Sequence, residues 1–214
     1  MVYLPTDEIS FPDPRHYHPI AGLIAAGGDL SASRLLLSYQ MGIFPWYEPG
    51  EEILWWCPDP RFVLFPDRLK VSKSMRKVLK SNVFRVTENQ AFEQVMRNCK
   101  TIQRKDQEGT WISEGLVSSF LKLHHSGIAQ SVEVWKQEKL VGGFYGLKIG
   151  RVFCGESMFS AESNASKAGF ITFVQHHRND FDLIDCQVHS NHLESLGAEM
   201  ITKEAFLSYL PFFD

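Results

Sequence analysis

Two side chains suited to proton transfer and hydrogen bonding lie close together near the end of the chain. Asp185 and Gln187 belong to the short apolar run 183–188, which its composition predicts to be a β-strand. Residues two apart in a strand point to one face, so we expect the carboxylate and the amide to be neighbours. Such a pair can orient a nucleophile, or it can satisfy buried backbone groups, and the strand alone leaves both interpretations open.

The histidines and cysteines lack the spacing of a metal site. Histidines that a metal hydrolase could use occur at His124–His125, His176–His177, His189 and His192. None stands in an HExxH motif or beside acids at a recognised ligand spacing, so surface or capping roles are favoured. No cysteines form a CxxC pair, which predicts reduced core thiols at Cys57, Cys99, Cys154 and Cys186. We expect no metal.

One basic segment offers a surface for phosphate groups, although the formal net charge of the whole chain is −3. Residues 66–85 contain seven Lys or Arg and one acid. A helix predicted over 72–81 places four bases on one face at i, i+3, i+4 and i+7. These bases are Lys73, Arg76, Lys77 and Lys80. The face can bind a nucleic-acid backbone or be a solvated surface, and both interpretations stay open.

Aromatic residues are concentrated between residues 43 and 60, where three of the five tryptophans fall within eleven residues. Interspersed prolines predict an irregular aromatic surface rather than a regular element. Most of these rings are expected to form a small core beneath loops. A partly open Trp46 or Tyr47 can instead stack on a base or an aromatic substrate.

The elements around Asp185 and Gln187 have the order of a sheet with a helix packed across it. Three strands are predicted, then a helix capped by Ser163 or Asn164, then the strand 183–188. The three strands cover Ser131–Trp135, Val141–Leu147 and Arg151–Phe159, and the helix ends near Asp180. Glycines within these strands indicate either β-bulges or close backbone approach by a ligand. They are Gly142, Gly143, Gly146 and Gly155.

Length and composition bound the rest of the chain. With 214 residues and 44% hydrophobic residues, it can form one large or two small domains with a packed core. The first 14 residues lack the features of a signal peptide, and no run approaches the ~20 apolar residues of a membrane span. We therefore expect a cytoplasmic protein with no membrane segment. Further helices are predicted at 32–42, 88–100, 113–126, 193–197 and 203–210.

Eight short motifs resemble those of the bacterial leucyl/phenylalanyl-tRNA–protein transferases, in the same order and spacing from about residue 20 to 210. They are GGDLS (27–31), GIFPW (42–46), LWWCPDPR (54–61), GTWI (109–112), LVGGFYG (140–146), GESMFS (155–160), NASK (164–167) and DCQV (185–188). The resemblance implies an α+β fold with a small N-terminal domain, 1–62. It also implies a C-terminal domain, 63–214, similar to acetyltransferases of the GNAT superfamily, with a mixed sheet flanked by helices.

The resemblance also implies an activity. Such enzymes transfer leucine or phenylalanine, and methionine less well, from aminoacyl-tRNA to proteins that begin with Arg or Lys, marking them for N-end-rule degradation. No cofactor is implied, and a monomer is expected. Catalysis would involve Glu156, Asp185 and Gln187. The aminoacyl pocket would be formed by Trp46, Trp111, Phe144, Phe153, Gly155, Met158, Phe170 and Phe173. Phe144 stands where some family members have Met.

Two other functions share part of this pattern. An acyl-CoA-dependent acetyltransferase needs a glycine-rich pyrophosphate loop before the long helix, but residues 160–169 read SAESNASKAG, which disfavours coenzyme A. A non-catalytic tRNA-binding module would keep the basic helix without needing Glu156, Asp185 and Gln187. Within the transferase hypothesis, Asp185 can orient the Gln187 amide, and either Glu156 or Asp185 can hold the acceptor's cationic side chain. The sequence does not apportion these roles.

Overall fold

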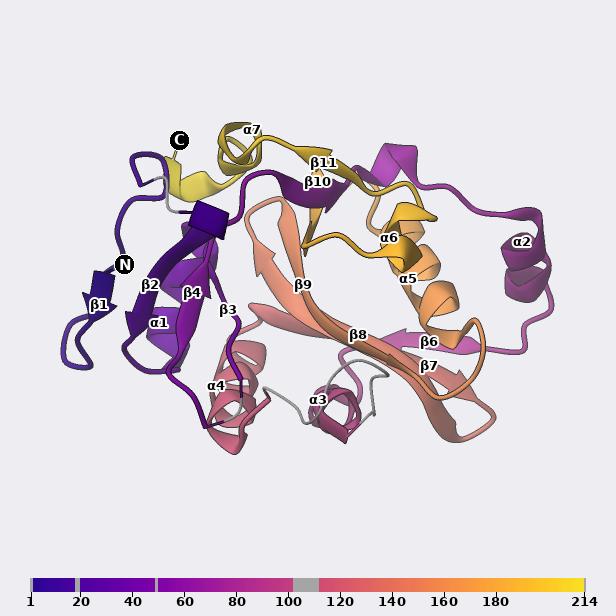
Figure 1. Cartoon of the computed structure of the whole chain (residues 1–214). Coiled ribbons are helices and arrows are strands. Elements are labelled where there is room, and N and C mark those ends of the chain that lie inside the picture. The colour runs from indigo at the N-terminus through magenta and orange to yellow at the C-terminus, as the bar shows by residue number, and fades with distance from the viewer. Residues whose placement is uncertain (1, 18–19, 49, 102–111, 214) are drawn as a thin grey trace.

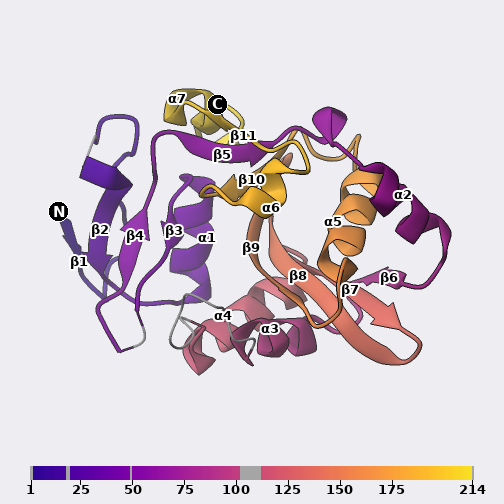
Figure 2. The same cartoon turned by 45° about the vertical axis from the view of Figure 1, so that its right-hand side comes forward.

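Two β-sheets of different size form the framework of the protein (Figure 1). The computed structural model describes residues 2–17, 20–48, 50–101 and 112–213. The smaller sheet, near the N-terminus, has the strand order β1-β2-β4-β3. The larger sheet has the order β11-β5-β10-β9-β8-β7-β6 and includes the strand that carries Asp185. Figure 2 shows the two sheets beside one another, with helices α3 and α4 below them.

The larger sheet is built around an antiparallel meander of three long strands. They are β7 (Ala129–Lys136), β8 (Lys139–Ile149) and β9 (Val152–Ser160). Strand β10 (Leu183–Gln187) returns parallel to β9 after helix α5, whereas its other neighbour, β5 (Arg61–Leu64), is antiparallel. The antiparallel edge strands are β6 (Arg85–Glu88) and β11 (Glu199–Ile201). The prediction of an α+β protein with a mixed sheet flanked by helices is confirmed.

The smaller sheet contains the aromatic segment. Its strands are β1 (Val2–Leu4), β2 (Leu23–Gly27), β3 (Phe44–Pro45) and β4 (Leu54–Trp56). The prediction that this segment lacks regular elements was therefore wrong, because β4 pairs with both β2 and β3. Trp55 is fully buried and donates its indole N–H to the carbonyl oxygen of Gly27. The expected aromatic core exists, but it is formed on a strand rather than beneath loops.

Helices cover the sheets and carry the basic face. Their bounds are α1 (Ala32–Gln40), α2 (Lys73–Lys80), α3 (Phe92–Thr101), α4 (Glu114–His125), α5 (Ala165–His176), α6 (Asn191–Glu194) and α7 (Lys203–Leu207). Helices α3 and α5 both pack on the larger sheet, and α1 contacts α4 and β8. Ser31 and Ser72 accept backbone N–H groups as the N-caps of α1 and α2. Helix α5 ends at His176 rather than near Asp180.

Close packing explains three of the four strand glycines, and at Gly143 a Cβ atom would lie 2.6 Å from the Val132 carbonyl oxygen. A Cβ atom at Gly142 would lie 2.9 Å from the Cβ of Ala165, so the glycine lets the start of α5 approach the sheet. The register of β8 against β9 shifts between Tyr145 and Gly146, and a Cβ at Gly146 would lie 2.2 Å from the Cys154 carbonyl oxygen. A bulge is therefore confirmed at Gly146.

One hydrophobic core joins the two sheets, because residues from β2, β4, α1, α3, α4, β8 and β9 belong to the same buried cluster. The proposed domain boundary after residue 62 remains a prediction; β5, which begins at Arg61, already belongs to the larger sheet. None of the described helices is long and apolar enough to cross a membrane.

Candidate active site

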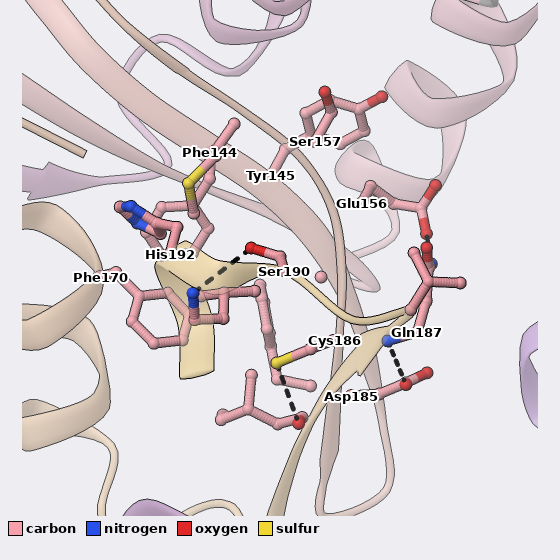
Figure 3. A pocket seen from close by; sticks show the side chains of 16 residues that line it. Phe144, Tyr145, Glu156, Ser157, Phe170, Asp185, Cys186, Gln187, Ser190 and His192 are labelled. Carbon is pink, nitrogen blue, oxygen red and sulfur yellow. Dashed lines mark hydrogen bonds between the residues drawn. The ribbon is translucent and has the colours of Figure 1, made fainter. Parts of the chain in front are cut away.

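A pocket of about 340 Å³ opens between strands β9 and β10, and α5 and α6 complete its walls. The parallel ladder of these strands ends where Asp185 lies opposite Cys154, and most of the pocket-lining residues of both strands lie at or beyond this point. Figure 3 shows Phe144, Phe170 and His192 toward one end of the pocket and Glu156 and Gln187 toward the other. The pocket is lined by Phe144, Tyr145, Phe153, Gly155, Glu156, Ser157, Met158, Phe170, Ile184, Asp185, Cys186, Gln187, Val188, Ser190, His192 and Leu193.

The Asp185 carboxylate is sealed inside the sheet by a buried arginine. Arg61, on β5, donates from Nε to Oδ1 at 2.8 Å and from Nη2 to Oδ2 at 2.7 Å. Both side chains are almost completely buried, at 1% and 0% exposed. Burial lowers the pKa of Arg61, and attraction and hydrogen bonding to Asp185 more than reverse this, so its pKa lies above the ordinary value. The Asp185 side chain therefore presents no exposed surface to the pocket in this arrangement.

Gln187 sits at a bulge rather than one pleat beyond Asp185. In the pairing of β10 with β5, the register shifts between Asp185 and Gln187, and Gln187 has a left-handed φ of 63°. Its backbone N–H donates to Asp185 Oδ1 at 2.9 Å, and its side-chain Nε2 donates to Glu156 Oε1 at 2.6 Å. The bulge interrupts the alternation on which the same-face expectation rested, so strand geometry no longer supports it and it stays a prediction.

Glu156 brings a carboxyl group to the pocket beside Gln187. Burial raises the pKa of Glu156 to about 8, so the carboxyl group changes its protonation state within about one pH unit of neutral pH. The Tyr39 hydroxyl of α1 and the Gln187 amide both lower the pKa of Glu156 and so oppose this rise. The Tyr39 hydroxyl is near Glu156 but makes no hydrogen bond of normal geometry to a described residue. Glu156 keeps some exposed surface on the pocket side. A carboxyl group with this proton affinity can both accept and return a proton.

The remaining wall of the pocket is largely apolar. Among the predicted aminoacyl-pocket residues, Phe144, Phe153, Gly155, Met158 and Phe170 line it. A Cβ atom at Gly155 would lie 3.4 Å from the Asp185 carbonyl oxygen and meet nothing closer. Phe173 does not line the pocket; its ring packs behind the wall, 5.4 Å from Phe144 and 4.7 Å from Phe153 between centroids.

The sequence interpretation missed polar groups at this wall. His192 lines the pocket, and its Nε2 atom is buried without a hydrogen-bond partner among the described residues. Burial and the charge of Lys167 lower the His192 pKa, which favours the neutral imidazole. Ser190 also lines the pocket and caps α6 by accepting from the Leu193 N–H. Their position three and five residues beyond Gln187, after the end of the strand, was the signal that could have indicated them.

Trp46 and the four predicted bases of α2 do not line the pocket. Trp46 is 45% exposed, next to Trp56, whose indole N–H donates to the Trp46 carbonyl oxygen. Trp111 lies outside the described residues. All four bases of α2 are exposed, and none forms an ion pair with a described acid. Helix α2 contacts α5, at the end of the molecule away from the smaller sheet (Figure 2).

The histidines have structural partners in several cases. His177 bonds Asp180 and Glu88 at 2.7 and 2.8 Å, and His124 stacks on Phe92 and bonds the Ala129 carbonyl oxygen. Across the described residues, no three His, Cys, Asp or Glu side chains gather as a metal site would require.

Two family models match the chain in sequence. Residues 63–211 match the model described as leucyl/phenylalanyl-tRNA protein transferase, and residues 28–59 match the model of its N-terminal domain. The chain belongs to the leucyl/phenylalanyl-tRNA protein transferase family. The prediction made from the sequence motifs is confirmed, and the matched segments include Glu156, Asp185 and Gln187 but not Arg61.

Curated relatives from several bacteria match this chain over most of its length. A leucyl/phenylalanyl-tRNA–protein transferase of Flavobacterium johnsoniae is 54% identical, over 88% of this chain and 90% of its own. The one from Pectobacterium carotovorum is 50% identical, over 97% and 88% respectively. A solved GCN5-related N-acetyltransferase-like protein from Streptococcus suis aligns with 75% of this chain and 60% of its own, at 12% identity and a TM-score of 0.39.

Proposed function

We propose that this protein transfers leucine or phenylalanine, and methionine less well, from aminoacyl-tRNA to the N-terminal Arg or Lys of acceptor proteins. The observation that carries the proposal is the pairing of an apolar pocket with the Glu156–Gln187 contact at its mouth. The product is a new peptide bond, and the modified proteins enter N-end-rule degradation. The enzyme is proposed to act as a cytoplasmic monomer without a cofactor.

The reaction is the aminolysis of an ester. The neutral α-amine of the acceptor attacks the carbonyl carbon that joins the amino acid to the tRNA 3′-terminal ribose. A C–N bond forms, the carbonyl π electrons move onto oxygen, and collapse of this intermediate breaks the bond to the ribose oxygen. The nitrogen loses one proton, and the departing ribose oxygen gains one. Because an α-amine has a pKa of ~7.7–8.0, a strong base is not required.

Glu156 and Gln187 are suited to this proton movement. The Gln187 Nε2 that donates to Glu156 leaves the amide oxygen free to accept from the attacking amine and direct its lone pair. The pKa of Glu156, about 8, matches that of the amine, so its carboxylate can take the proton and return it to the ribose oxygen. Asp185 takes no direct part, because Arg61 and the Gln187 backbone occupy its oxygens.

The apolar wall supports selection of the amino acid. Phe144, Phe153, Met158 and Phe170 favour long apolar side chains, and entry of a charged side chain would require its desolvation. A β-branched side chain is expected to clash near the ester, beside Gly155. Phe173 is proposed to act indirectly, by holding the rings of Phe144 and Phe153 in place.

The tRNA is proposed to reach the pocket across α5. The exposed bases Lys73, Arg76, Lys77 and Lys80 on α2 support phosphate contacts, since no described acid neutralises them. Trp46 is exposed at the edge of the smaller sheet, and either Trp46 or Trp111 is proposed to stack on the terminal adenine. The tRNA body would then contribute binding affinity, and the pocket would select the amino acid.

The preference for Arg or Lys acceptors is proposed to rest on Glu156. Since Asp185 is sealed by Arg61, Glu156 is the carboxyl group lining the described pocket that can face an incoming cation. A bound guanidinium or ammonium favours the ionised form of Glu156. A cationic acceptor would therefore favour the Glu156 carboxylate, the form that can take the proton of its α-amino group.

Direct transfer tests this proposal. Leucyl-tRNA is incubated with a peptide that begins with Arg, in the presence of EDTA and without coenzyme A, and the peptide mass is measured. The proposal predicts a gain of one leucyl residue at the N-terminus. A peptide of the same sequence with an acetylated N-terminus is the control and should remain unmodified. No leucylation of the free peptide would overturn the proposal.

A further inference from the structure

Arg61 is a buried charge that the proposed chemistry does not use. It lies on β5, 1% exposed, with its guanidinium 4.7 Å from the Phe44 ring centroid and 4.4 Å from that of Phe206. Phe44 belongs to β3 of the smaller sheet, and Phe206 belongs to α7. Removing a charged pair from water is costly, and an apolar pair of similar size often stabilises a fold as well. Stability alone is therefore a weak reason for this ion pair.

The ion pair ends at the backbone of Gln187. Asp185 Oδ1 accepts from both Arg61 Nε and the Gln187 N–H, at 2.8 and 2.9 Å. Gln187 is held at a φ of 63°, a conformation that costs free energy for a side chain other than glycine and persists only when its surroundings fix it. The same residue directs its side-chain amide to Glu156 at 2.6 Å.

We propose that Arg61 is a positioning residue, which acts through Asp185 to hold Gln187 in the left-handed conformation that presents its amide to Glu156 and the substrate. The inference rests on the proposed function, in which Gln187 directs the attacking amine. Asp185 is then neither a proton acceptor nor a binding group for the acceptor protein. Its two oxygens connect a fixed guanidinium to the backbone of the residue that meets the substrate.

Single substitutions would confuse positioning with stability, since loss of one partner leaves the other charge buried and unpaired. Two neutral double variants avoid this problem. Arg61→Met/Asp185→Asn keeps a side-chain oxygen that can accept from the Gln187 N–H. Arg61→Met/Asp185→Leu removes that acceptor with little change in side-chain volume. Positioning predicts different activities for the two variants, whereas a purely structural ion pair predicts the same activity.

A second ion pair, beside the same sheet, provides a control. Arg151, which directly precedes β9, pairs in a bidentate manner with Asp182, which directly precedes β10. The two side chains are 54% and 47% exposed, and neither lines the pocket. The variant Arg151→Met/Asp182→Leu therefore removes similar groups beside the same sheet without touching Gln187. It should keep the kcat of the unchanged enzyme.

The measurement is kcat and KM for leucine transfer to an Arg-initiated peptide, with circular dichroism to confirm folding. We expect the Asp185→Leu double variant to lose roughly 100-fold in kcat, since displacement of a positioned group by about 1 Å can cost this much, with KM for leucyl-tRNA nearly unchanged. The Asp185→Asn double variant should lose an intermediate amount, because it keeps the acceptor for the Gln187 N–H but not the guanidinium that fixes it. Adding Gln187→Ala to the Asp185→Leu variant should cause no further loss, because the pair acts only through Gln187.

The inference would be overturned if the folded double variants kept the kcat of the wild-type enzyme. It would also be overturned if the fold-loss in kcat of the Asp185→Leu double variant and that of Gln187→Ala multiplied when the substitutions were combined. A crystal structure of the Asp185→Leu double variant tests the same point without activity. Positioning predicts that Gln187 leaves the left-handed region and its Glu156 contact, and an unchanged Gln187 would contradict it. If the wild-type protein transferred no leucine, the proposed function would be refuted, while the crystallographic comparison would still decide the inference.

Discussion

The side-chain amide of Gln187 donates to the carboxyl group of Glu156 across 2.6 Å, although 31 residues separate them. The contact joins strands β9 and β10 where their ladder ends and the pocket begins. It places a hydrogen-bonding amide and a carboxyl group with a pKa of about 8 beside an apolar cavity. An ester aminolysis needs orientation of the amine and a route for one proton, and this pair can provide both.

Substitution of Gln187 should affect chemistry rather than binding. We expect Gln187→Ala to lower kcat by roughly 100-fold or more, because the amide acts on the attacking amine, with little change in tRNA affinity. Asp185→Ala should also lower kcat, and it should destabilise the fold by ~3–5 kcal/mol because it leaves Arg61 unpaired. Single-turnover rates, filter binding of tRNA and urea unfolding measure these effects. Near-normal turnover in both folded variants would refute the assigned roles.

The raised pKa of Glu156 predicts a pH-dependent stability difference. Since the folded pKa of about 8 exceeds the ordinary value of 4.5, the folded state holds a proton that the unfolded state loses between these pH values. The free energy of unfolding should therefore fall as pH rises through this window, relative to Glu156→Gln. The difference is expected to be on the order of a few kcal/mol. Urea unfolding of both proteins at pH 5 and pH 8 checks it, and parallel profiles would contradict it.

The same titration predicts the pH dependence of turnover. If the Glu156 carboxylate takes the proton of the attacking amine, kcat should rise as pH increases toward and through about 8. Glu156→Gln should lower kcat and remove that part of the rise. An acceptor with a neutral first residue should show the rise at higher pH than an Arg-initiated acceptor, because the cation favours the ionised carboxylate. Identical profiles for the enzyme and its Gln variant would exclude Glu156 from proton transfer.

Removal of the basic face should weaken tRNA binding without regard to tRNA identity. Replacing Lys73, Arg76, Lys77 and Lys80 with Ala should reduce the affinity for all elongator tRNAs similarly. The slope of log affinity against log salt should become shallower by up to ~0.7–0.9 per lost phosphate contact. The same change at the exposed residues Lys122, Lys139 and Lys148, which lie on other elements, is the control. An unchanged slope in the quadruple variant would indicate a merely solvated surface.

The sequence predicted the catalytic sheet well because its strands and helix have strong local patterns. The runs that became β7, β8, β9 and α5 combine alternating or helical periodicity with clear turns. Strands β5 and β6 were not predicted, because each has only four residues and gains its stability from long-range pairing. The aromatic strand β4 was missed because neighbouring prolines indicated loops.

The site was predictable only in part. Of the residues that the resemblance assigned, Glu156, Gln187 and five of the eight aminoacyl-pocket residues line the pocket, while their roles stay predictions. The same-face relation of Asp185 and Gln187 could not be derived from the sequence, because the bulge and the positive φ that interrupt the alternation there are set by tertiary contacts. Arg61 lies 124 residues from Asp185 in the chain, and no periodicity connects them. His192 was seen as a possible metal ligand, whereas its contribution to the pocket wall depends on the fold.

The most direct test of the pocket is a comparison of two amino acids on one tRNA. Leucine and isoleucine are attached to the same tRNA sequence, and kcat/KM is measured for transfer to one Arg-initiated peptide. Because the side chains have the same atoms and differ in branching, the difference should reflect the pocket wall, at ~1–3 kcal/mol or roughly 10- to 200-fold in favour of leucine. Equal values would contradict selection by the pocket and assign specificity to the tRNA.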